Sequence, residues 1–271
     1  LVLARTTTSY DDGAGGTYMG PAIAVLATDE NVYTYPVSDD KIEADDIVQV
    51  TVNSSGSLII SRVSSTSLSG QFSNDGSKLG EYPISSDIEI LDLYESSGIR
   101  LYPSRLAGLT LSRSDVLYYR LDSNGAIDRL ILDDFSGEHH TYGMLLEKEE
   151  FSFGSSLTVI YELSLSSGTS YLNLSKSFPA KEGPVVIMGS MQDPDDILSL
   201  EKKTVDRFEA NAVVLGGKSY SYAQSVVVLE RVGDEYFSST LARISSGAFD
   251  TVSACYRSSS DPAIRLIIAE N

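Results

Sequence analysis

The sequence contains little of the chemistry on which most enzymes and many secreted domains depend. Its 271 residues include one cysteine, two histidines and no tryptophan. A single cysteine excludes an internal disulfide framework and any metal site of the CxxC type. Lysine and arginine number 20 against 38 aspartates and glutamates, giving a formal net charge of −18. Because nucleic-acid phosphates and anionic lipids attract basic proteins, we expect no nucleic-acid partner.

Long hydrophobic runs are also absent. The longest unbroken apolar run, Ala22 to Ala27, has six residues, far below the ~18 of a membrane-spanning helix. Hydrophobic residues nevertheless make up 42% of the chain and charged residues only 21%, a mixture that can form a buried core. The length predicts about two domains at ~150 residues each. We therefore expect a globular chain without membrane insertion.

The chain opens on an apolar, strand-like segment rather than on a methionine. Leu1-Val2-Leu3-Ala4 resembles a strand already under way, and Asn271 directly follows another apolar run. We therefore expect a fragment of a longer protein, for which a missing signal peptide carries no information about location.

What the chain does contain is alternation of apolar and polar residues with a period of two, the pattern of β-strands. It is clearest in four runs: Ile47–Val52, Ile88–Leu93, Val116–Leu121 and Val226–Leu229. Asn53–Gly56 and Asp122–Gly125 place a glycine where a tight turn needs positive φ, so both predict β-hairpin loops. Only residues 195–208 also fit a helix, with Asp195 and Asp196 at its start.

An internal repeat is the strongest signal. The segment from Asp46 to Leu58 aligns without gaps with the segment from Asp115 to Ile127, and such self-similarity marks a repeated structural unit. There is also a second, longer period of about 136 residues. It relates Tyr82-Pro83-Ile84 to Tyr220-Ser221-Tyr222 and Arg129-Leu130-Ile131 to Arg265-Leu266-Ile267. The offset drifts slightly, as small loop insertions would cause. In this register residues 195–208 lie opposite a serine-rich segment that contains Gly70, which favours strand over helix there.

The repeat predicts an all-β chain of tandem small β-barrels, SH3-like or OB-like. A single continuous sandwich or β-solenoid is the alternative, ranked lower because the turns do not recur at the ~20–30-residue spacing of a solenoid coil. The duplication spans about 136 residues, and each half comprises two units of about 68 residues. The predicted units are residues 1–66, which begin in mid-strand, 67–136, 137–204, the most diverged, and 205–271. Closure is expected because open edge strands invite aggregation and barrels remove them.

Several of these residues also carry a resemblance. The string Ser114–Tyr119, followed by Asp122, Gly125, Ile127, Leu130, Leu132, Asp134 and Tyr142-Gly143, resembles the repetitive β-rich regions of bacterial surface proteins with S-layer homology modules. Gly15–Tyr18, Val32–Pro36 and Asp45–Val48 are similar to the opening of the same kind of barrel. The resemblance covers most of residues 10–145 and is weaker beyond them. It implies an exported protein of the bacterial cell wall, with cell-wall polysaccharide or other surface proteins as partners through the parent chain.

Candidate catalytic and metal-binding residues are few. Adjacent His139 and His140 point to opposite faces of a strand, so at most Glu138 and His140 could share a metal; a polar loop is the simpler interpretation. Asp122, Asn124 and Asp128 have only a faint calcium-loop spacing. Cys255 lies in an apolar run without a base nearby, and we expect it to be buried. We predict no catalytic residue, no metal site and no cofactor.

Tyrosine is the remaining candidate for binding. Sixteen tyrosines are present, and three close pairs could form exposed stacking surfaces for sugars or peptides: Tyr33 and Tyr35, Tyr118 and Tyr119, and Tyr220 and Tyr222. Alternate tyrosines can equally pack inside a barrel with their hydroxyls wet, the interpretation we favour. The sequence thus predicts a non-catalytic spacer or adhesive region, with a carbohydrate- or peptide-binding module as the alternative.

Overall fold

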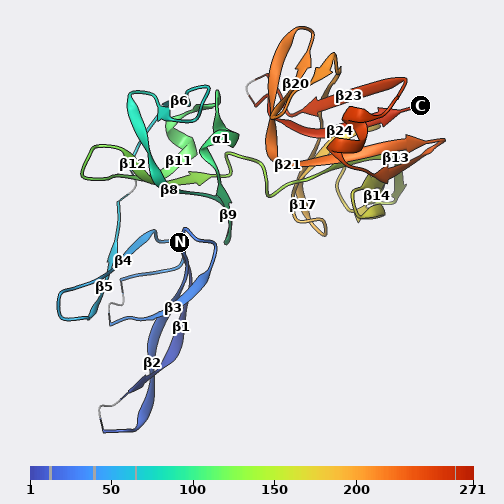
Figure 1. The fold of residues 1–271 in the computed structure, drawn as a ribbon. Helices are drawn as coiled ribbons and strands as arrows, with labels where there is room; N and C mark the ends of the chain where they lie inside the picture. Colours follow the sequence, from blue (N-terminus) through green and yellow to red (C-terminus); the bar gives the residue numbers. More distant parts are fainter. Residues whose placement is uncertain (12–13, 39–40, 65, 260) are drawn as a thin grey trace. The chain divides into compact units, whose positions relative to one another are not determined.

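The computed structural model describes residues 1–271 except residues 12–13, 39–40, 65 and 260. The chain divides into two compact units, Leu1–Ser136 and Gly137–Asn271, here called unit 1 and unit 2. β-Strands dominate both units, and the helices among the described residues are short (Figure 1). The prediction of an all-β chain is therefore confirmed.

The described residues of unit 1 form four open sheets and two short helical turns. Its first half contains β1 (Val2–Asp11), β2 (Thr17–Leu26), β3 (Val32–Pro36), β4 (Val48–Val52) and β5 (Leu58–Arg62). Its second half contains β6 (Gly70–Gln71), β7 (Lys78–Leu79), β8 (Tyr82–Tyr94), β9 (Ser97–Leu101), α1 (Pro103–Leu106), β10 (Thr110–Leu111), η1 (Arg113–Asp115), β11 (Val116–Leu121) and β12 (Ile127–Asp133). The strands pair in the orders β1-β2-β3, β4-β5, β10-β6 and β11-β12-β8-β7, with β9 also on β8.

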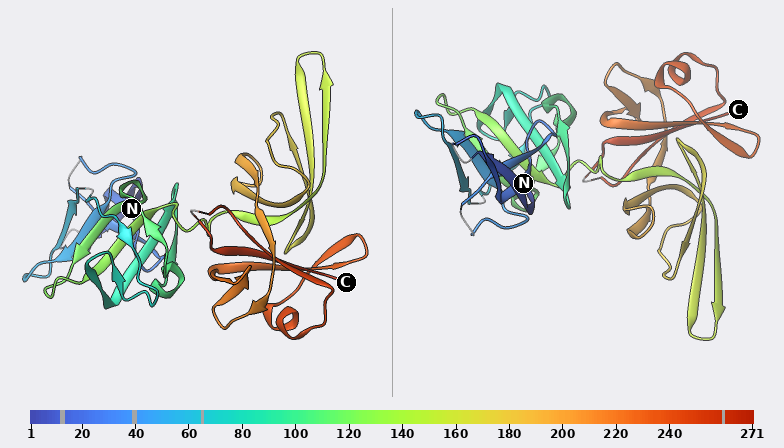
Figure 2. Two further views of the ribbon diagram at one scale, coloured as in Figure 1. Left: turned by 90° about the horizontal axis from the view of Figure 1, so that it is seen from above. Right: turned by 90° about the horizontal axis from the view of Figure 1, so that it is seen from below.

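The described residues of unit 2 form two larger sheets. The first joins β13 (Thr141–Phe153), β14 (Ser156–Leu165), β15 (Gly168–Leu174), β16 (Gly183–Gly189) and β17 (Pro194–Ser199) in the order β15-β14-β13-β16-β17. The second contains β18 (Glu201–Thr204), β19 (Arg207–Phe208), β20 (Ala212–Leu215), β21 (Lys218–Val232), β22 (Glu235–Ser238), α2 (Leu241–Ser246), β23 (Thr251–Tyr256) and β24 (Ile264–Glu270). Figure 2 shows β13 and β14 as a long yellow-green hairpin.

The two units repeat one topology in their second halves. In unit 1 the hairpins β7–β8 and β8–β9 lead through α1 to the hairpin β11–β12, whose last strand runs parallel to β8. In unit 2 the hairpins β20–β21 and β21–β22 lead through α2 to β23–β24, whose last strand runs parallel to β21. The internal repeat seen in the sequence is therefore a repeat of strand connections.

The repeat extends to the irregularities of the sheets. Between Ile127 and Arg129 the partner on β8 jumps from Ile84 to Glu89. Between Ile264 and Leu266 the partner on β21 jumps from Tyr222 to Val227, a step of the same size. A bulge changes the twist and direction of a strand. The same bulge at the same place therefore shows that the second halves of the two units correspond residue by residue. The equivalent positions, such as Ile127 and Ile264, are separated by the long period seen in the sequence.

The first halves repeat as well. A one-residue bulge interrupts the β1–β2 pairing between Val2 and Ala4, and another interrupts β13–β14 between Leu145 and Glu147. The hairpin β4–β5 matches β16–β17, because Val48 pairs with Arg62 as Val185 pairs with Ser199.

Each of the four predicted segments has its own cluster of buried side chains. The clusters centre on Ile23, Leu130, Tyr161 and Ile267, one in each segment. Two further clusters, here called the joint cores, each combine residues from both segments of a unit. The joint core of unit 1 comprises Leu1, Leu26, Leu91, Leu93 and Ile131. The joint core of unit 2 comprises Tyr142, Met144, Val186, Leu200, Leu229, Cys255, Leu266 and Ile268. Burial in the joint cores makes each unit one body.

The structure differs from the expected small barrels. The sheets of the described residues are open, so none of them closes into an SH3-like or OB-like barrel. The predicted division at residues 204 and 205 also separates β18 from β23, although β18 pairs with it from Glu201 to Thr204. The physical reason is the joint core: apolar faces that closure would have covered are covered by the neighbouring segment.

Local predictions fare better. Residues 195–208 form the strands β17, β18 and β19, as the repeat favours. The two hairpin loops are built alike, with Gly56 at φ +82° and Gly125 at φ +78°. The side-chain oxygen of Asn53 accepts the backbone N–H groups of Ser55 and Ser57. Asp122 performs the same function in its own loop, so both hairpin predictions are confirmed.

The joint cores predict how the chain yields to force. We expect stretching of the full chain to show two unfolding steps, because each joint core couples its two segments into one cooperative body. Each step should release roughly 45 nm of chain, since an extended residue spans about 3.3–3.6 Å. Single-molecule force spectroscopy measures the step lengths. Four steps of about half that length would show instead that the segments unfold independently.

Candidate functional site

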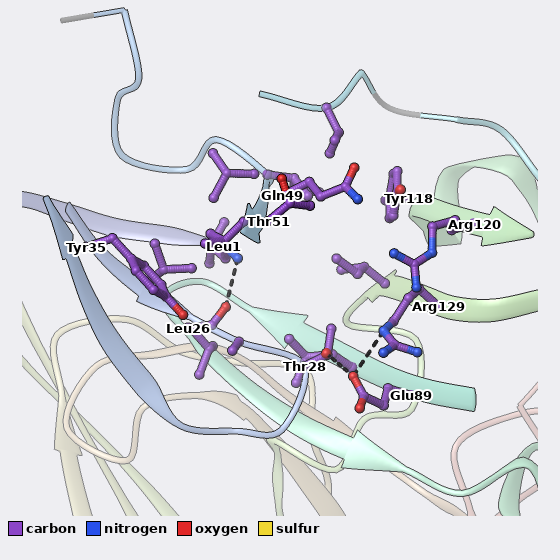
Figure 3. Close-up of a pocket in the computed structure, with 18 residues that line it drawn as sticks. Leu1, Leu26, Thr28, Tyr35, Gln49, Thr51, Glu89, Tyr118, Arg120 and Arg129 are labelled. Carbon is purple, nitrogen blue, oxygen red and sulfur yellow. Dashed lines mark hydrogen bonds and ion pairs between the residues drawn. The ribbon is translucent and has the colours of Figure 1, made fainter. Parts of the chain in front are cut away.

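A cavity of about 300 Å³ lies between the two halves of unit 1 (Figure 3). Strands β2, β3, β4, β8, β11 and β12 contribute to its lining. The lining residues are Leu1, Val25, Leu26, Ala27, Thr28, Tyr35, Ile47, Val48, Gln49, Val50, Thr51, Val63, Glu89, Leu91, Tyr118, Arg120, Arg129 and Ile131. The cavity therefore exists only because both segments fold onto one joint core.

Strand alternation decides which side chains face the cavity. On β4 the side chain of Val48 packs with the cluster of the first segment, and that of Ile47 packs with the joint core. With a period of two, Gln49 and Thr51 share the face of Ile47. Figure 3 shows both polar side chains across the cavity from Thr28 and Glu89. The cavity thus combines an apolar floor with polar walls.

The charged groups in the cavity wall are paired. Arg129 Nε lies 3.1 Å from Glu89 Oε2, and the Thr28 hydroxyl donates a hydrogen bond to the same oxygen. Arg120 forms a two-pronged ion pair with Asp128, with distances of 2.9 and 2.7 Å. Hydrogen bonds from Arg120 lower the pKa of Asp128, and the same bonds raise the pKa of Arg120. Each arginine is thus paired with a carboxylate, so the cavity has no net attraction for a single sign of charge.

The lining mixes polar and apolar groups. Thr28, Gln49, Thr51 and Glu89 supply polar side chains beside the rings of Tyr35 and Tyr118. Apolar side chains with a few fixed polar groups are typical of ligand cavities.

The structure separates the predicted tyrosines. Tyr35 and Tyr118, from different segments, both line the cavity. Tyr33 lies beside Tyr35 at a ring distance of 6.1 Å and is 40% exposed. Its hydroxyl donates to Asp29, and this hydrogen bond raises the pKa of Tyr33. Tyr119 points the other way, against Tyr82 and the core of its own segment, because neighbouring side chains on a strand alternate.

The unit 2 pair packs against its own core. Tyr222 is only 6% exposed and belongs to the cluster around Ile267, so its ring offers no surface for stacking. Tyr220 stacks on Tyr256 at 5.4 Å, and the ammonium group of Lys203 lies 5.7 Å from the ring of Tyr220.

Glu138 is engaged by an arginine rather than by a metal-binding partner. Its carboxylate lies 3.2 Å from Arg265, and the two side chains are 3% and 2% exposed. The same carboxylate accepts the backbone N–H groups of Gln224 and Ser225. Glu138 and both histidines lie in a turn after Gly137, as the simpler interpretation predicts.

The aspartates of the faint calcium pattern are likewise committed. Asp122 caps its hairpin loop, and Asp128 is paired with Arg120. Within the described ranges no group of three or more potential metal ligands gathers, and no helix is long and apolar enough to cross a membrane. Cys255 is fully buried, as expected, and burial raises the pKa of its thiol to about 12.

Comparison with family models, curated proteins and solved structures finds no match for this chain. The site therefore rests on geometry alone. Sequence reasoning missed Gln49, Glu89, Arg120 and Arg129. The alternation of β4 could have flagged Gln49 as a polar residue beside a core. Arg120 and Arg129 are cross-strand partners in the hairpin β11–β12, and Glu89 joins them only through the parallel pairing of β12 with β8.

The buried ion pair of unit 2 predicts a large effect of breaking it. Replacing Arg265 with alanine should destabilise the chain by about 3–5 kcal/mol, because the Glu138 carboxylate would stay buried without its countercharge. The exposed pair of Arg207 and Glu209 provides the control, since R207A should cost less than about 1 kcal/mol. Urea unfolding curves measure both. Equal losses in the two variants would contradict this account.

Burial predicts that Cys255 is chemically silent in the folded chain. Because its pKa is raised to about 12, thiolate is scarce near pH 8 and the sulfur is inaccessible. A thiol-specific chromogenic reagent should therefore leave the native chain unlabelled and label one thiol in denaturant. Rapid labelling of the native chain would show that the joint core of unit 2 opens readily.

Proposed function

We propose that this chain is a non-catalytic structural region, a spacer or adhesive stalk, of an exported bacterial cell-surface protein of the S-layer-associated kind. In this proposal the working element is the repeated segment, used four times as two pairs. Each pair acts as one stiff block because its joint core is shared. Cell-wall polysaccharide or other surface proteins are the expected partners of the parent chain.

One observation carries the proposal: both units reproduce the same strand connections and the same bulge. Duplication with preserved register adds length and stiffness without adding a reactive group, which is what a spacer requires. Repetition of one fold along a chain is the common route to extended structural proteins.

The charge pattern supports the same role. A net charge of −18 favours solubility and makes neighbouring copies repel each other. Several of the most deeply buried charges, such as Arg265 and Glu138, are paired within one unit. The surface charges therefore govern repulsion between molecules, whereas the buried ion pairs affect the stability of each unit.

A binding module is the second candidate, and the cavity of unit 1 favours it. Tyr35 and Tyr118 were predicted from separate parts of the sequence and line the same space. Tyrosine rings with polar neighbours can stack on sugars or grip peptides. This candidate is compatible with an adhesive stalk, because unit 1 can bind the ligand while unit 2 adds to the length of the stalk.

Surface display tests the proposal directly. Antibodies raised against residues 1–271 should label intact cells of the producing bacterium, and external protease should remove the signal. Labelling only after lysis would contradict the proposal. Glycan arrays and cell-wall fragments, applied to the purified chain, test the second candidate. Saturable binding that Y118A and Y35A both abolish would favour the binding module over a pure spacer.

A further inference from the structure

The long hairpin of unit 2 carries exposed aromatic side chains. Strands β13 and β14 reach beyond the rest of the unit (Figure 2). Among the described residues, β16 stops pairing with β13 at Leu145, and β15 stops pairing with β14 at Val159. The outer part of the hairpin is therefore a ribbon of two strands. Near its tip Phe153 is 91% exposed and Phe151 is 51% exposed.

The two phenylalanines share one face of the ribbon with three glutamates. This face, here called the hairpin face, consists of four cross-strand pairs: Glu147 with Glu162, Glu149 with Ile160, Phe151 with Thr158, and Phe153 with Ser156. All eight side chains point the same way, because opposite residues share a face and the face recurs every two residues. The glutamates lie at its base and the phenylalanines at its tip. Contiguous exposed apolar side chains with a polar border are typical of interaction sites.

The glutamates of the hairpin face have no countercharge. Glu147 and Glu162 stand directly opposite each other, an arrangement of like charges that destabilises a sheet. Among the described residues, no lysine or arginine lies within ion-pair distance of these two or of Glu149. Lys148 lies on the other face of the ribbon, where its ammonium group donates to Phe178 O at 2.8 Å. A cationic partner would therefore relieve an existing repulsion.

The base of the hairpin face continues into a groove of about 600 Å³. Glu147 and Glu162 line this groove together with Glu182, Asp234 and Arg231. Arg231 is the one basic residue among the described lining residues, and it is already paired with Asp234 at 3.4 Å. The groove therefore attracts positive charge. Within the described parts of the chain, no three carboxylates or other ligands gather closely enough to hold a metal ion, which favours a cationic side chain as the occupant.

The duplicate hairpin in unit 1, β1–β2, shows what the fold itself requires. The matching bulges make Ala4 equivalent to Glu147, and the strands then correspond residue by residue. Arg5 is equivalent to Lys148, and its guanidinium group likewise donates to a backbone carbonyl, Ile42 O, at 2.6 Å. This basic anchor on the inner face is thus common to both hairpins and belongs to the fold.

The charges of the hairpin face are not common to both hairpins. The unit 1 equivalents of Glu147, Glu149, Phe151 and Glu162 are small and uncharged: Ala4, Thr6, Thr8 and Ala24. The fold therefore forms without a glutamate or a phenylalanine at these positions. Their presence in unit 2 adds surface chemistry that the packing of the hairpin does not require.

The aromatic side chain nearest the tip is also treated differently. Tyr10, the equivalent of Phe153, stacks on Tyr18 at a ring distance of 5.2 Å. Its ring also lies directly over Gly20, where an added Cβ would meet Tyr10 Cε2 at 2.6 Å. In unit 2 Thr158 stands in the place of Gly20, and Phe153 stays exposed. The aromatic ring of unit 1 is packed within its own hairpin, whereas that of unit 2 is free to contact a partner.

The charge of the hairpin face selects among the possible occupants. A second copy of the same face would bring glutamates against glutamates, and anionic lipids or acidic sugars would be repelled for the same reason. A neutral sugar brings no countercharge. A polypeptide with lysine or arginine beside apolar side chains satisfies both parts of the face, since the long stems of these residues also cover apolar surface. The face is about 20 Å long from Glu147 to Phe153 at ~3.3 Å per residue, the length of a seven-residue strand.

We propose that the hairpin face and the adjoining groove bind a basic segment of another protein, in which lysine or arginine side chains adjoin aromatic or aliphatic ones. The basic side chains lie beside Glu147 and Glu162, and the apolar side chains cover Phe151 and Phe153. Buried aromatic side chains supply most of the energy of such contacts, and the charges supply orientation and speed of association. This inference goes beyond the proposed function, because it holds wherever the parent chain is displayed.

Two synthetic peptides of the same composition test the proposal. Lys-Thr-Lys-Thr-Leu-Thr-Phe places its basic side chains at one end of a strand face and its apolar side chains at the other, whereas Lys-Thr-Leu-Thr-Lys-Thr-Phe mixes them. Fluorescence anisotropy with the full chain should show saturable binding of the first peptide and about threefold weaker binding of the second, because only the first matches both ends of the face. No saturable binding of the first peptide, or equal binding of both, would overturn the proposal.

A pair of double variants tests the aromatic end. F151S/F153S should weaken binding of the first peptide about tenfold, because it removes the apolar anchors. V52S/L58S is the matched control, since Val52 and Leu58 are an exposed cross-strand pair on the hairpin β4–β5 of unit 1. The control should leave binding unchanged. Equal binding by the two variants would contradict the proposal.

A second pair of double variants tests the acidic end. E147Q/E149Q should weaken binding about threefold, as expected for two exposed ion pairs. E81Q/D87N removes the same number of exposed charges from unit 1 and should leave binding nearly unchanged. If both variants weaken binding equally, the peptide responds only to the net charge of the chain, and the proposal fails.

Other occupants of the hairpin face give different results. Size-exclusion chromatography of the chain alone detects self-association, and sedimentation with phosphatidylcholine vesicles detects lipid binding. A dimer, or vesicle binding, that F151S/F153S abolishes would mean that a second copy or a membrane covers the phenylalanines, and either result would refute the proposal. A monomer that does not sediment with the vesicles supports it. Surface display measures location alone, so failure of the peptide experiments would leave the proposed spacer role standing.

Discussion

The parallel pairing of the last strand of each unit with its long central strand is the interaction on which the rest of the structure depends. In unit 1 the pair Ile90 and Leu130 faces the core of the second segment. The next pair, Leu91 and Ile131, faces the joint core. One pair of strands thus separates two cores and belongs to both. Strands buried on two faces read as continuous apolar runs, which explains Leu130-Ile131-Leu132.

The same arrangement recurs in unit 2, where Val228 pairs with Ile267 and Leu229 with Ile268. Because the central pair is shared, neither segment can lose it without uncovering apolar surface of the other. This coupling explains why four segments with their own clusters still form two units rather than four. It also makes closure into small barrels unnecessary, because the apolar face that closure would bury in each segment is buried against the neighbouring segment.

The two units differ in the side chains between their segments. In unit 2 the joint core is formed by apolar side chains such as Val186, Cys255 and Leu266. In unit 1 Gln49, Tyr118 and Arg129 line a cavity of about 300 Å³.

Sequence alone determined the class of structure and its local parts. Three features can be recognised from the sequence because they depend only on the order of residues along the chain. They are the alternation of period two, the glycine at the positive-φ position of each hairpin and the long repeat. Burial of Cys255 followed from its apolar run in the same way. Tertiary structure alone decided which segments share a core and which of the six tyrosines face a cavity. The reason is that parallel pairing and joint burial bring together residues far apart in sequence, such as Glu89 with Arg129, and no local pattern encodes that distance.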